Sequence, residues 1–441
     1  MNRRGMTLVE MMVAVTATLI LMGAVAQVFS VFGTAVSNSR SMLELDSRLR
    51  VVANRLRTDL KGVTARTLPS LSPDTAEGYF EIIEGPWQES DVADGAAVAR
   101  TDVDDALLFT TRSPAAPFVG RGTAGTFESP VAEVAWFARQ TVDPRGGFPI
   151  TFTLYRKQLL VLGYAGVAPF TDGENGYAAS SWPAHYLSCD VSARLESGRL
   201  RPNTLADLTK PENRFMHRPG NVVTGGGTAF PYLFVPHMWP TSNPAVDVMD
   251  SAIYSGALPG LIFDGTSSRA GEDIMLTNVL SFDVRVFDPG APVAISPAGN
   301  GVLVAGDPGF TNSPIGSGGY VDLGNGIVTN SVLAALGTSA VLSGTVGGSL
   351  ALGPGSRTIY DTWSTHYESD GVDQANPSNT TDQGSNGIDD DGDGRVDELD
   401  EQDGVPPYLQ ALRGIEVRIR CWEPTSRQVR QVTVRHTFVP H

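Results

Sequence analysis

The hydrophobic pattern of the chain changes twice, and each change indicates a different element. From residue 6 to about residue 32 nearly every position is apolar, which is long enough for a helix that spans a bilayer. Apolar residues then recur at steps of three or four, between charged residues, at Met42, Leu45, Leu49, Val52, Leu56 and Val63. This spacing predicts an amphipathic helix with one apolar stripe. Together the two segments predict one helix from residue 6 to about residue 65, with a bend at Gly33 and an end set by Pro69.

Beyond this helix, apolar and polar positions alternate, which predicts β-strands. The candidate strands are 79–85, 106–112, 131–138, 150–162, 275–287, 414–422 and 428–439. The last two are joined by a linker of turn length and predict a terminal antiparallel hairpin. In the first of these two, Val417, Ile419 and Cys421 alternate with arginines, so one face is expected to be buried and the other hydrated.

Two stretches, 202–270 and 289–358, are rich in Gly, Pro, Ser, Asn and Ala. We interpret them as long ordered or semi-ordered loops inserted between the strands. The order of a long helix, antiparallel strands and a C-terminal hairpin predicts an α+β fold, in which the sheet covers the apolar stripe of the helix.

A short basic leader precedes the apolar run. Arg3 and Arg4 are followed by Gly5, and the one acid within the run is Glu10. An unpaired charge in lipid costs at least about 2.5 kcal/mol, so Glu10 needs a compensating partner. The leading arginines predict a cytoplasmic N-terminus, with the rest of the chain outside the cytoplasm. The simpler alternative is an ordinary anchor helix whose acid lies near the interface and stays hydrated.

The stretch RRGMTLVEMMVAVTATL resembles the prepilin signal of type IV pilins and type II secretion pseudopilins. In that family a membrane aspartyl peptidase removes the leader after the glycine, and the new N-terminus is methylated. The resemblance implies cleavage between Gly5 and Met6 by a prepilin peptidase/N-methyltransferase, with methylation of Met6. Phe is more common than Met at that position. In a filament, the N-terminal amine of one subunit would pair with Glu10 of its neighbour, which neutralises both charges and fixes their register.

The resemblance also implies a pilin-like division of the chain. Its parts are a leader at 1–5, a transmembrane and assembly helix at 6–33, an amphipathic helix at 34–68 and a β-rich head at 69–441. The stretches LDSRLRVVANRLRTDLKGVTART and RGIEVRIRCWEPTSRQVRQVTVRHTFV are similar to J-type minor pseudopilins. This similarity does not cover the middle of the chain.

A minor pseudopilin would be a structural subunit at or near the tip of a type II secretion pseudopilus, aiding protein export across the outer membrane. It would be anchored by one helix in the inner membrane, with its head periplasmic or extracellular. Its partners would be other minor and major pseudopilins and exported proteins. Two alternatives remain open: a minor pilin of a type IV pilus or DNA-uptake system, and a membrane-anchored surface adhesin.

The charge of the chain is acidic, with a net value of −16, which argues against nucleic acid as a general partner. Residues 368–403 hold thirteen acids and one base. Within them, NGIDDDGDGRVDELDE at 386–401 has the alternate spacing of a calcium loop, with Gly394 at the sharp turn. The predicted ligands are Asp389, Asp391, Asp393, the Arg395 carbonyl, Asp397 and Asp400. The alternative is a disordered acidic linker.

The remaining candidate chemistry is sparse. Cys189 and Cys421 could pair as a disulfide in an exported head, and two buried free thiols are the alternative. The six histidines are scattered, and no HExxH, GxSxG, P-loop or dinucleotide motif is present. The sequence therefore favours a protein that is not an enzyme.

Overall fold

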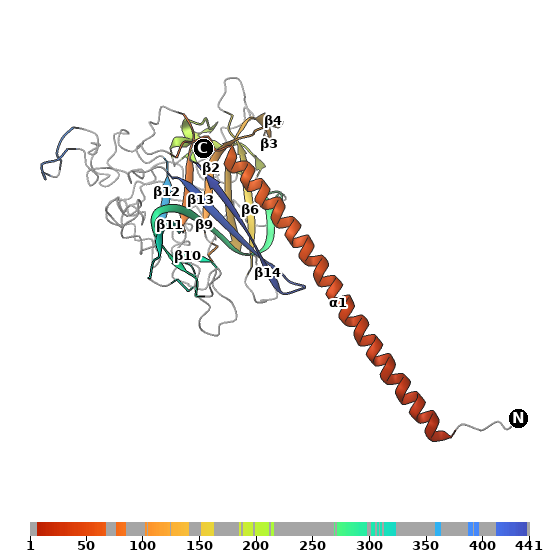
Figure 1. The fold of residues 1–441 in the computed structure, drawn as a ribbon. Coiled ribbons are helices and arrows are strands. Elements are labelled where there is room, and N and C mark those ends of the chain that lie inside the picture. The colour runs from red at the N-terminus through yellow and green to blue at the C-terminus, as the bar shows by residue number, and fades with distance from the viewer. Residues whose placement is uncertain are drawn as a thin grey trace, which may run out of the picture.

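The computed structural model combines one long helix with an antiparallel sheet (Figure 1). It describes residues 7–67, 76–84, 102–103, 105–123, 125–140, 151–162, 185–186, 188–196, 199–210, 213–215, 269, 271–297, 301–304, 307, 309–310, 313–322, 358–362, 387–390, 392–396 and 412–438. The elements are α1 (Leu8–Lys61), β1 (Phe80–Glu84), β2 (Ala106–Arg112), β3 (Phe118–Gly122), β4 (Gly125–Ser129), β5 (Val131–Gln140), β6 (Phe152–Leu160), β7 (Ala193–Glu196), β8 (Arg199–Pro202), the 3-10 helix η4 (Asp207–Thr209), β9 (Ile274–Ile295), β10 (Val302–Val304), β11 (Gly316–Val321), β12 (Thr358–Asp361), β13 (Gly414–Glu423) and β14 (Gln428–Thr437). The fold is α+β and pilin-like, as the sequence predicts.

Helix α1 runs for 54 residues and passes through Gly33 without interruption, so the bend expected there is absent. It also ends earlier than predicted. Its last residue is Lys61, and Gly62 forms the C-cap, with its N–H bonded to the carbonyls of Asp59 and Leu60. Pro69 therefore does not end the helix. Lys61 in the last turn followed by Gly62 is a common signal for the end of a helix, and it was not used in the prediction.

Gly62 is required by the close approach of the sheet. A Cβ at this position would lie 2.1 Å from the carbonyl oxygen of Arg112 at the end of β2. The Arg112 N–H donates to the Gly62 carbonyl over 2.7 Å, which ties the end of the helix to that strand. No side chain fits between the two backbones.

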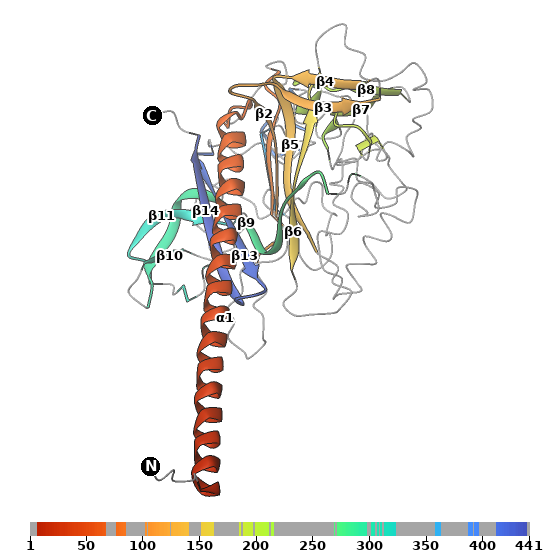
Figure 2. The same cartoon turned by 90° about the vertical axis from the view of Figure 1, so that its right-hand side faces the viewer.

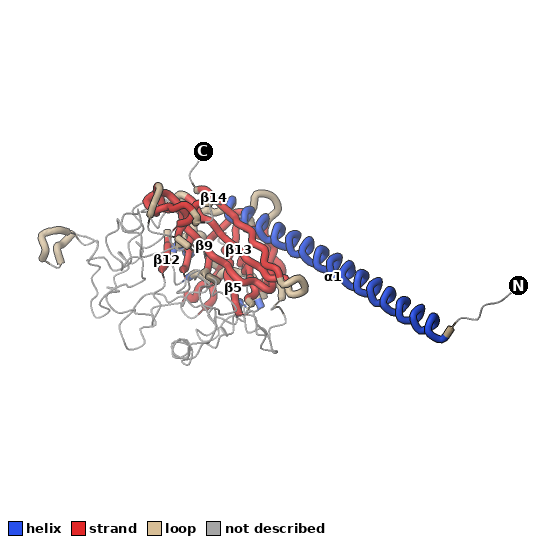
Figure 3. The backbone as a smooth tube through the Cα atoms, turned by 60° about the horizontal axis from the view of Figure 1, so that its bottom comes forward, coloured by secondary structure: helices blue, strands red, loops and turns tan. Residues whose placement is uncertain are grey.

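The sheet has ten strands, and all of its pairings are antiparallel. Its main order is β12-β1-β2-β5-β6-β9-β13-β14, and β10 and β11 pair with the outer part of β9. The long helix and the sheet lie against each other in Figure 3. Neighbouring strands such as β1 and β12 are far apart in the sequence, so the sheet is complete only when the whole head has folded.

Both faces of the central strands are buried. On one face, Phe80, Leu107, Trp136 and Val417 join the buried stripe of α1 in a single cluster. On the other face, residues such as Leu108 pack under the segment that carries β7, β8 and η4. Figure 2 shows α1 and this segment on opposite sides of the sheet. Because both faces are covered, β2 is buried at six consecutive positions instead of at alternate ones.

All seven predicted strands are present, and β2 has the predicted bounds. The structure corrects the view of 289–358 as a loop throughout, because β9 continues to Ile295 and is followed by β10 and β11. The continuation crosses Pro289 and Pro292. Opposite these residues, β11 pairs irregularly between Ser317 and Gly319, so the missing proline N–H groups interrupt no regular ladder. Most of 202–270 lies outside the described residues.

The terminal hairpin matches its prediction. Strands β13 and β14 pair from Gly414 opposite Thr437 to Glu423 opposite Gln428. Val417, Ile419 and Cys421 are buried, and the arginines between them are partly exposed. Four residues, 424–427, form the turn, in which Arg427 adopts a φ of 54°.

Candidate functional site: the N-terminal assembly helix

The first turn of α1 is stabilised by a capping box between Thr7 and Glu10. The Glu10 N–H donates to Thr7 Oγ1 over 3.2 Å, and the Thr7 N–H donates to Glu10 Oε2 over 2.9 Å. Arg3, Arg4, Gly5 and Met6 lie outside the described residues. The pattern Thr-x-x-Glu in the sequence is the signature of a capping box, which was not among the predictions.

The capping box gives Glu10 hydrogen-bond donors but no opposite charge. Both donors come from Thr7, which is neutral. Within the described part of the chain, Glu10 has no cationic partner. A carboxylate placed in a membrane or in a bundle of helices would still need a cation, so the need for an external partner stands.

The first half of α1 leaves its apolar side chains uncovered. All residues from 7 to 37 are exposed, including Leu8 at 76%, Leu19 at 64% and Phe29 at 72%. By length and composition this segment is able to cross a membrane. In Figures 1 and 2 it extends well beyond the head. A bare apolar surface of this size indicates burial by lipid or by other chains.

The second half of α1 is held on the sheet by a buried ion pair. The Asp59 carboxylate accepts from Arg156 of β6 at both oxygens, over 2.7 and 2.9 Å. It also accepts from Trp136 Nε1 over 3.1 Å, and the Asp59 carbonyl accepts from Thr111 Oγ1 over 2.7 Å. Both charged side chains are almost fully buried. Paired in this way, they lock the helix to β2, β5 and β6 in one position.

The role of Asp59 was not predicted from the sequence, although a signal was present. The stripe residues Leu49, Val52 and Leu56 are followed, three positions later, by an acid in place of an apolar residue. An acid at a stripe position predicts a buried partner. Which base supplies that partner depends on β6, which lies 97 residues away in the sequence.

A second set of buried charges lies where β9 meets β11 and β13. Arg285 forms ion pairs with Asp283, Asp307 and Asp322. Burial raises the pKa of Asp283 to about 7, and Asp322 adds to the effect, while Arg285 opposes it. These contacts fix the outer part of β9 to its neighbours.

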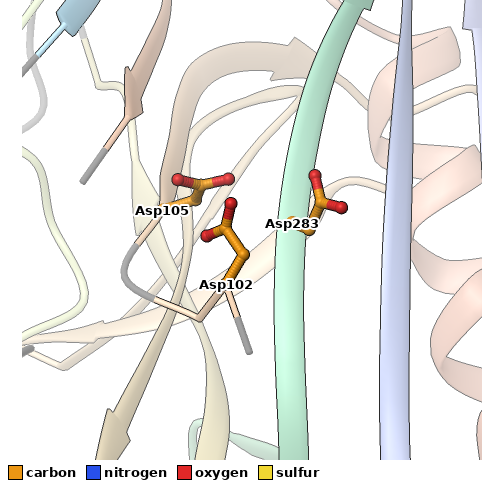
Figure 4. Close-up of side chains that lie close together, drawn as sticks. All are labelled: Asp102, Asp105 and Asp283. Carbon is orange, nitrogen blue, oxygen red and sulfur yellow. The ribbon is translucent and has the colours of Figure 1, made fainter. Parts of the chain in front are cut away.

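Figure 4 shows Asp102 and Asp105 beside Asp283. All three are buried, and their nearest carboxylate oxygens lie within 4.8 Å of one another. Asp105 also accepts from the Val284 N–H over 2.6 Å, and the Asp102 carbonyl accepts from the Phe282 N–H. These contacts attach the segment before β2 to β9. A cluster of carboxylates does not by itself define a metal site, and we assign it no ligand.

The predicted calcium loop is only partly described. Asp391, Asp397 and Asp400 lie outside the described residues. Asp389 accepts from the N–H groups of Gly392 and Gly394 over 2.6 and 2.8 Å, and Asp393 accepts from the Arg395 N–H over 2.9 Å. Gly394 has a φ of 95°, as the predicted sharp turn at this position requires. The geometry fits a calcium loop at these positions, and calcium binding stays a prediction.

The two cysteines are free and buried, so the possible disulfide is not formed in the structure. Cys421 lies in the main core, where its Sγ donates to the Thr277 carbonyl. Cys189 lies near Ser188 and Asp190, just before β7. Burial raises the pKa of both thiols, which keeps them protonated and unreactive.

Comparison with known proteins identifies the N-terminal segment. Residues 1–26 match the family model described as the prokaryotic N-terminal methylation motif. No curated protein and no solved structure gives a significant match. The match supports a prepilin-type signal of the kind found in type IV pilin-like proteins. The chain therefore joins a prepilin-type N-terminal methylation motif, on a helix able to span a membrane, to an α+β head of pilin-like architecture.

Proposed function

We propose that the protein is a minor pseudopilin, a structural subunit at or near the tip of a type II secretion pseudopilus. The observation that carries this proposal is the combination of the methylation motif at 1–26 with an uncovered apolar helix that contains one acid. Structural subunits of this type need an anchor, an assembly surface and a folded head. The similarity of 45–67 and 413–439 to J-type minor pseudopilins favours the secretion system over a surface pilus.

Assembly follows from the chemistry of the first turn. Removal of residues 1–5 leaves an amine on Met6, one residue from the N-cap Thr7. The capping box holds the Glu10 carboxylate at this end of the helix, where a neighbour's N-terminal amine would approach it. A charge pair formed between chains neutralises both ions away from water, and a displaced subunit would leave both unpaired. The pair thereby fixes the axial register of the helices.

The placement of the chain follows from the same segment. The leader arginines keep the N-terminus in the cytoplasm, the apolar half of α1 crosses the inner membrane, and the head lies in the periplasm. The calcium loop, when occupied, has a structural role in the head. The protein acts through its partners, which are the prepilin peptidase, other pseudopilins and exported proteins.

Substitutions at Glu10 and Thr7 test the assembly role. Glu10→Gln removes the charge but keeps an amide oxygen that can accept from Thr7. Thr7→Ala removes the hydroxyl of the capping box but keeps the charge. We expect Glu10→Gln to lose most of its co-purification with other pseudopilins from membranes, and Thr7→Ala to keep it. Equal co-assembly of Glu10→Gln and the wild-type protein would contradict the charge-pair role.

A deletion strain separates secretion from the pilus alternative. We expect loss of secreted enzymes from the medium, with twitching motility, DNA uptake and surface adhesion unchanged. Loss of twitching or of DNA uptake with normal secretion would assign the protein to a type IV pilus or an uptake system instead. Loss of adhesion alone would favour a surface adhesin.

A further inference from the structure

The basic residues on the second half of α1 fall into two groups. Arg48 pairs with Glu44, Arg55 pairs with Asp59, and Arg66, just beyond the helix, pairs with Glu77. Arg40, Arg50, Arg57 and Lys61 form no ion pair with any residue that the structure describes.

Three residues of the second group share one side of the helix. Arg50, Arg57 and Lys61 are separated by seven and four residues, so at about 100° per residue they project within roughly 40° of each other. Arg50 and Lys61 are exposed, and Arg57 is half-buried and donates to Asn54 over 3.1 Å. We call these three residues the basic face.

The acid nearest to this face already has a partner. Asp46 lies one turn before Arg50 on the same side of α1, and its carboxylate is 3.7 Å from Arg430 of β14. Because Arg430 already pairs with Asp46, the basic face keeps an excess of positive charge among the described residues, in a chain whose net charge is −16. A surface that shares the general acidity of the chain would complement it.

A lipid surface is too distant to serve as the partner. Arg50 is 18 residues beyond the end of the apolar run at residue 32, or about 27 Å at 1.5 Å per residue. The Debye length is about 8 Å at physiological ionic strength, so headgroup charge is screened at this distance. The face also extends from Arg50 to Lys61, about 16 Å along the helix axis and away from the membrane. This direction suits a partner that lies alongside the helix.

We propose that the basic face docks on an acidic protein surface of the neighbouring subunit in the filament. The inference rests on the proposed function. In a filament the first halves of neighbouring α1 helices would pack together, which would bring a neighbouring subunit beside the basic face on the same helix. The charges add specificity to an interface whose membrane part is apolar.

The chain contains a natural reporter for this contact. Its three lysines are Lys61, Lys157 and Lys210. Lys157 is buried and paired with Asp273, so the two exposed lysine amines are Lys61 on the basic face and Lys210 elsewhere on the head. A carbodiimide joins an amine directly to a carboxylate that contacts it. Treating membranes that contain the full-length protein, followed by mass spectrometry of the peptides, therefore identifies the acidic partner of Lys61.

We expect Lys61 to be linked to an Asp or Glu of another chain, and Lys210 not to be. Lys61→Arg keeps the charge and removes the reactive amine, so it should abolish the link. Arg50→Glu should lower the yield of the link roughly three- to tenfold, because it replaces an attraction by a repulsion. Arg48→Glu changes the charge equally, two residues away and on another side of the helix, and should leave the yield near that of the wild-type protein.

Three results would overturn the inference. The first is co-assembly with other subunits without any link from Lys61 to another chain, which would leave the proposed function intact. The second is an equal yield for Arg50→Glu and the wild-type protein, as expected for a hydrated face or a lipid contact. The third is an equal loss for Arg48→Glu and Arg50→Glu, which would indicate a general effect of charge. Failure of the wild-type protein to co-purify with any pilin-like subunit would overturn both proposals.

Discussion

Residues 8–37 and residues 42–60 belong to one continuous helix, but their apolar side chains meet different surroundings. In the first segment Leu8, Leu19 and Phe29 are exposed, and the structure places no sheet beside them. In the second, Leu49, Val52 and Leu56 are buried against the sheet. The helix therefore has one partner inside its own chain and needs another outside it. This division leaves the first half free to enter a membrane or a filament.

The two halves also treat charge differently. Asp59 in the second half is buried and paired with Arg156 of the same chain. Among the described residues, Glu10 in the first half has only the hydrogen bonds of its capping box. The chain thus pairs the buried acid of its head by itself, whereas the part of the chain that the structure describes offers no cation to the acid of its anchor. The predictions below test how separate the two halves are.

The largest effect on the free energy of unfolding is expected for Asp59→Ala, which leaves the Arg156 guanidinium buried without its carboxylate. Breaking a buried pair in this way costs about 3–5 kcal/mol of the free energy of unfolding. The control is Asp46→Ala, which removes an exposed pair of the same helix and should cost about 0–1 kcal/mol. Denaturant unfolding of the full-length protein in detergent measures both. Equal stability of the two variants would show that the buried Asp59–Arg156 pair contributes no more than the exposed Asp46–Arg430 pair.

Two leucines of the same helix give the next comparison. Leu56→Ala removes a fully buried side chain and should lower the free energy of unfolding by about 2–5 kcal/mol. Leu19→Ala removes a side chain that is 64% exposed and should leave the stability of the head unchanged within about 0.5 kcal/mol. The same unfolding experiment compares them. A similar loss for Leu19→Ala would mean that the first half packs on the head, contrary to the structure.

A pH effect should be confined to the head. The folded pKa of Asp283 is raised to about 7 from an ordinary 3.8, so the folded state holds this proton more tightly than the unfolded state does. The contribution of Asp283 to the free energy of unfolding is largest below about pH 4. It decreases as the pH rises to about 7, by at most about 1.4 kcal/mol per pH unit. The charged groups around the carboxyl are Arg285, Asp322, Arg418, Asp102 and Asp105.

Asp283→Asn tests this pH dependence because it keeps the shape of the side chain and cannot ionise. Its stability should vary less between pH 5 and pH 7.5 than that of the wild-type protein. Glu44→Gln, on the exposed side of α1, serves as the control and should keep the wild-type slope. An unchanged slope for Asp283→Asn would show that another group carries the pH dependence.

The smallest expected effect is that of calcium on the acidic loop. A site with a dissociation constant near 10⁻⁴ M should add about 1–2 kcal/mol at millimolar calcium. Asp389→Ala should abolish the difference in melting temperature between calcium and EGTA, whereas Asp390→Ala, at the intervening position, should keep it. No difference for the wild-type protein would favour the acidic linker.

Much of the fold could be predicted because its signals are local. Strand β2 is a short apolar run followed by two threonines and is bounded by polar residues, and the stripe of α1 repeats over several turns. The end of the helix was predicted from Pro69 and lies at Gly62 instead. The need for glycine at position 62 comes from the backbone of Arg112, which the sequence does not show to lie beside it. Strand β12 was missed because it is four residues long and is stabilised by pairing with β1, about 280 residues earlier.

The candidate site divides in the same way. The leader and Glu10 are contiguous in sequence, so a motif of fewer than 20 residues predicts them. The Asp59–Arg156 pair and the ion pairs of Arg285 join residues that are far apart in the sequence, and only the assembled sheet brings them together. The Thr7 capping box is local and could have been predicted. The calcium loop is local as well, but half of its predicted ligands lie outside the described residues.

The most direct test of the account is the mass of the N-terminal peptide of the protein isolated from cells with an active prepilin peptidase. The account predicts a chain that begins at Met6 and carries one methyl group on its amine, and a Gly5→Ala variant that keeps residues 1–5. A wild-type chain that still begins at Met1 would contradict it, because no amine would then be available next to Thr7 to pair with Glu10 of another subunit.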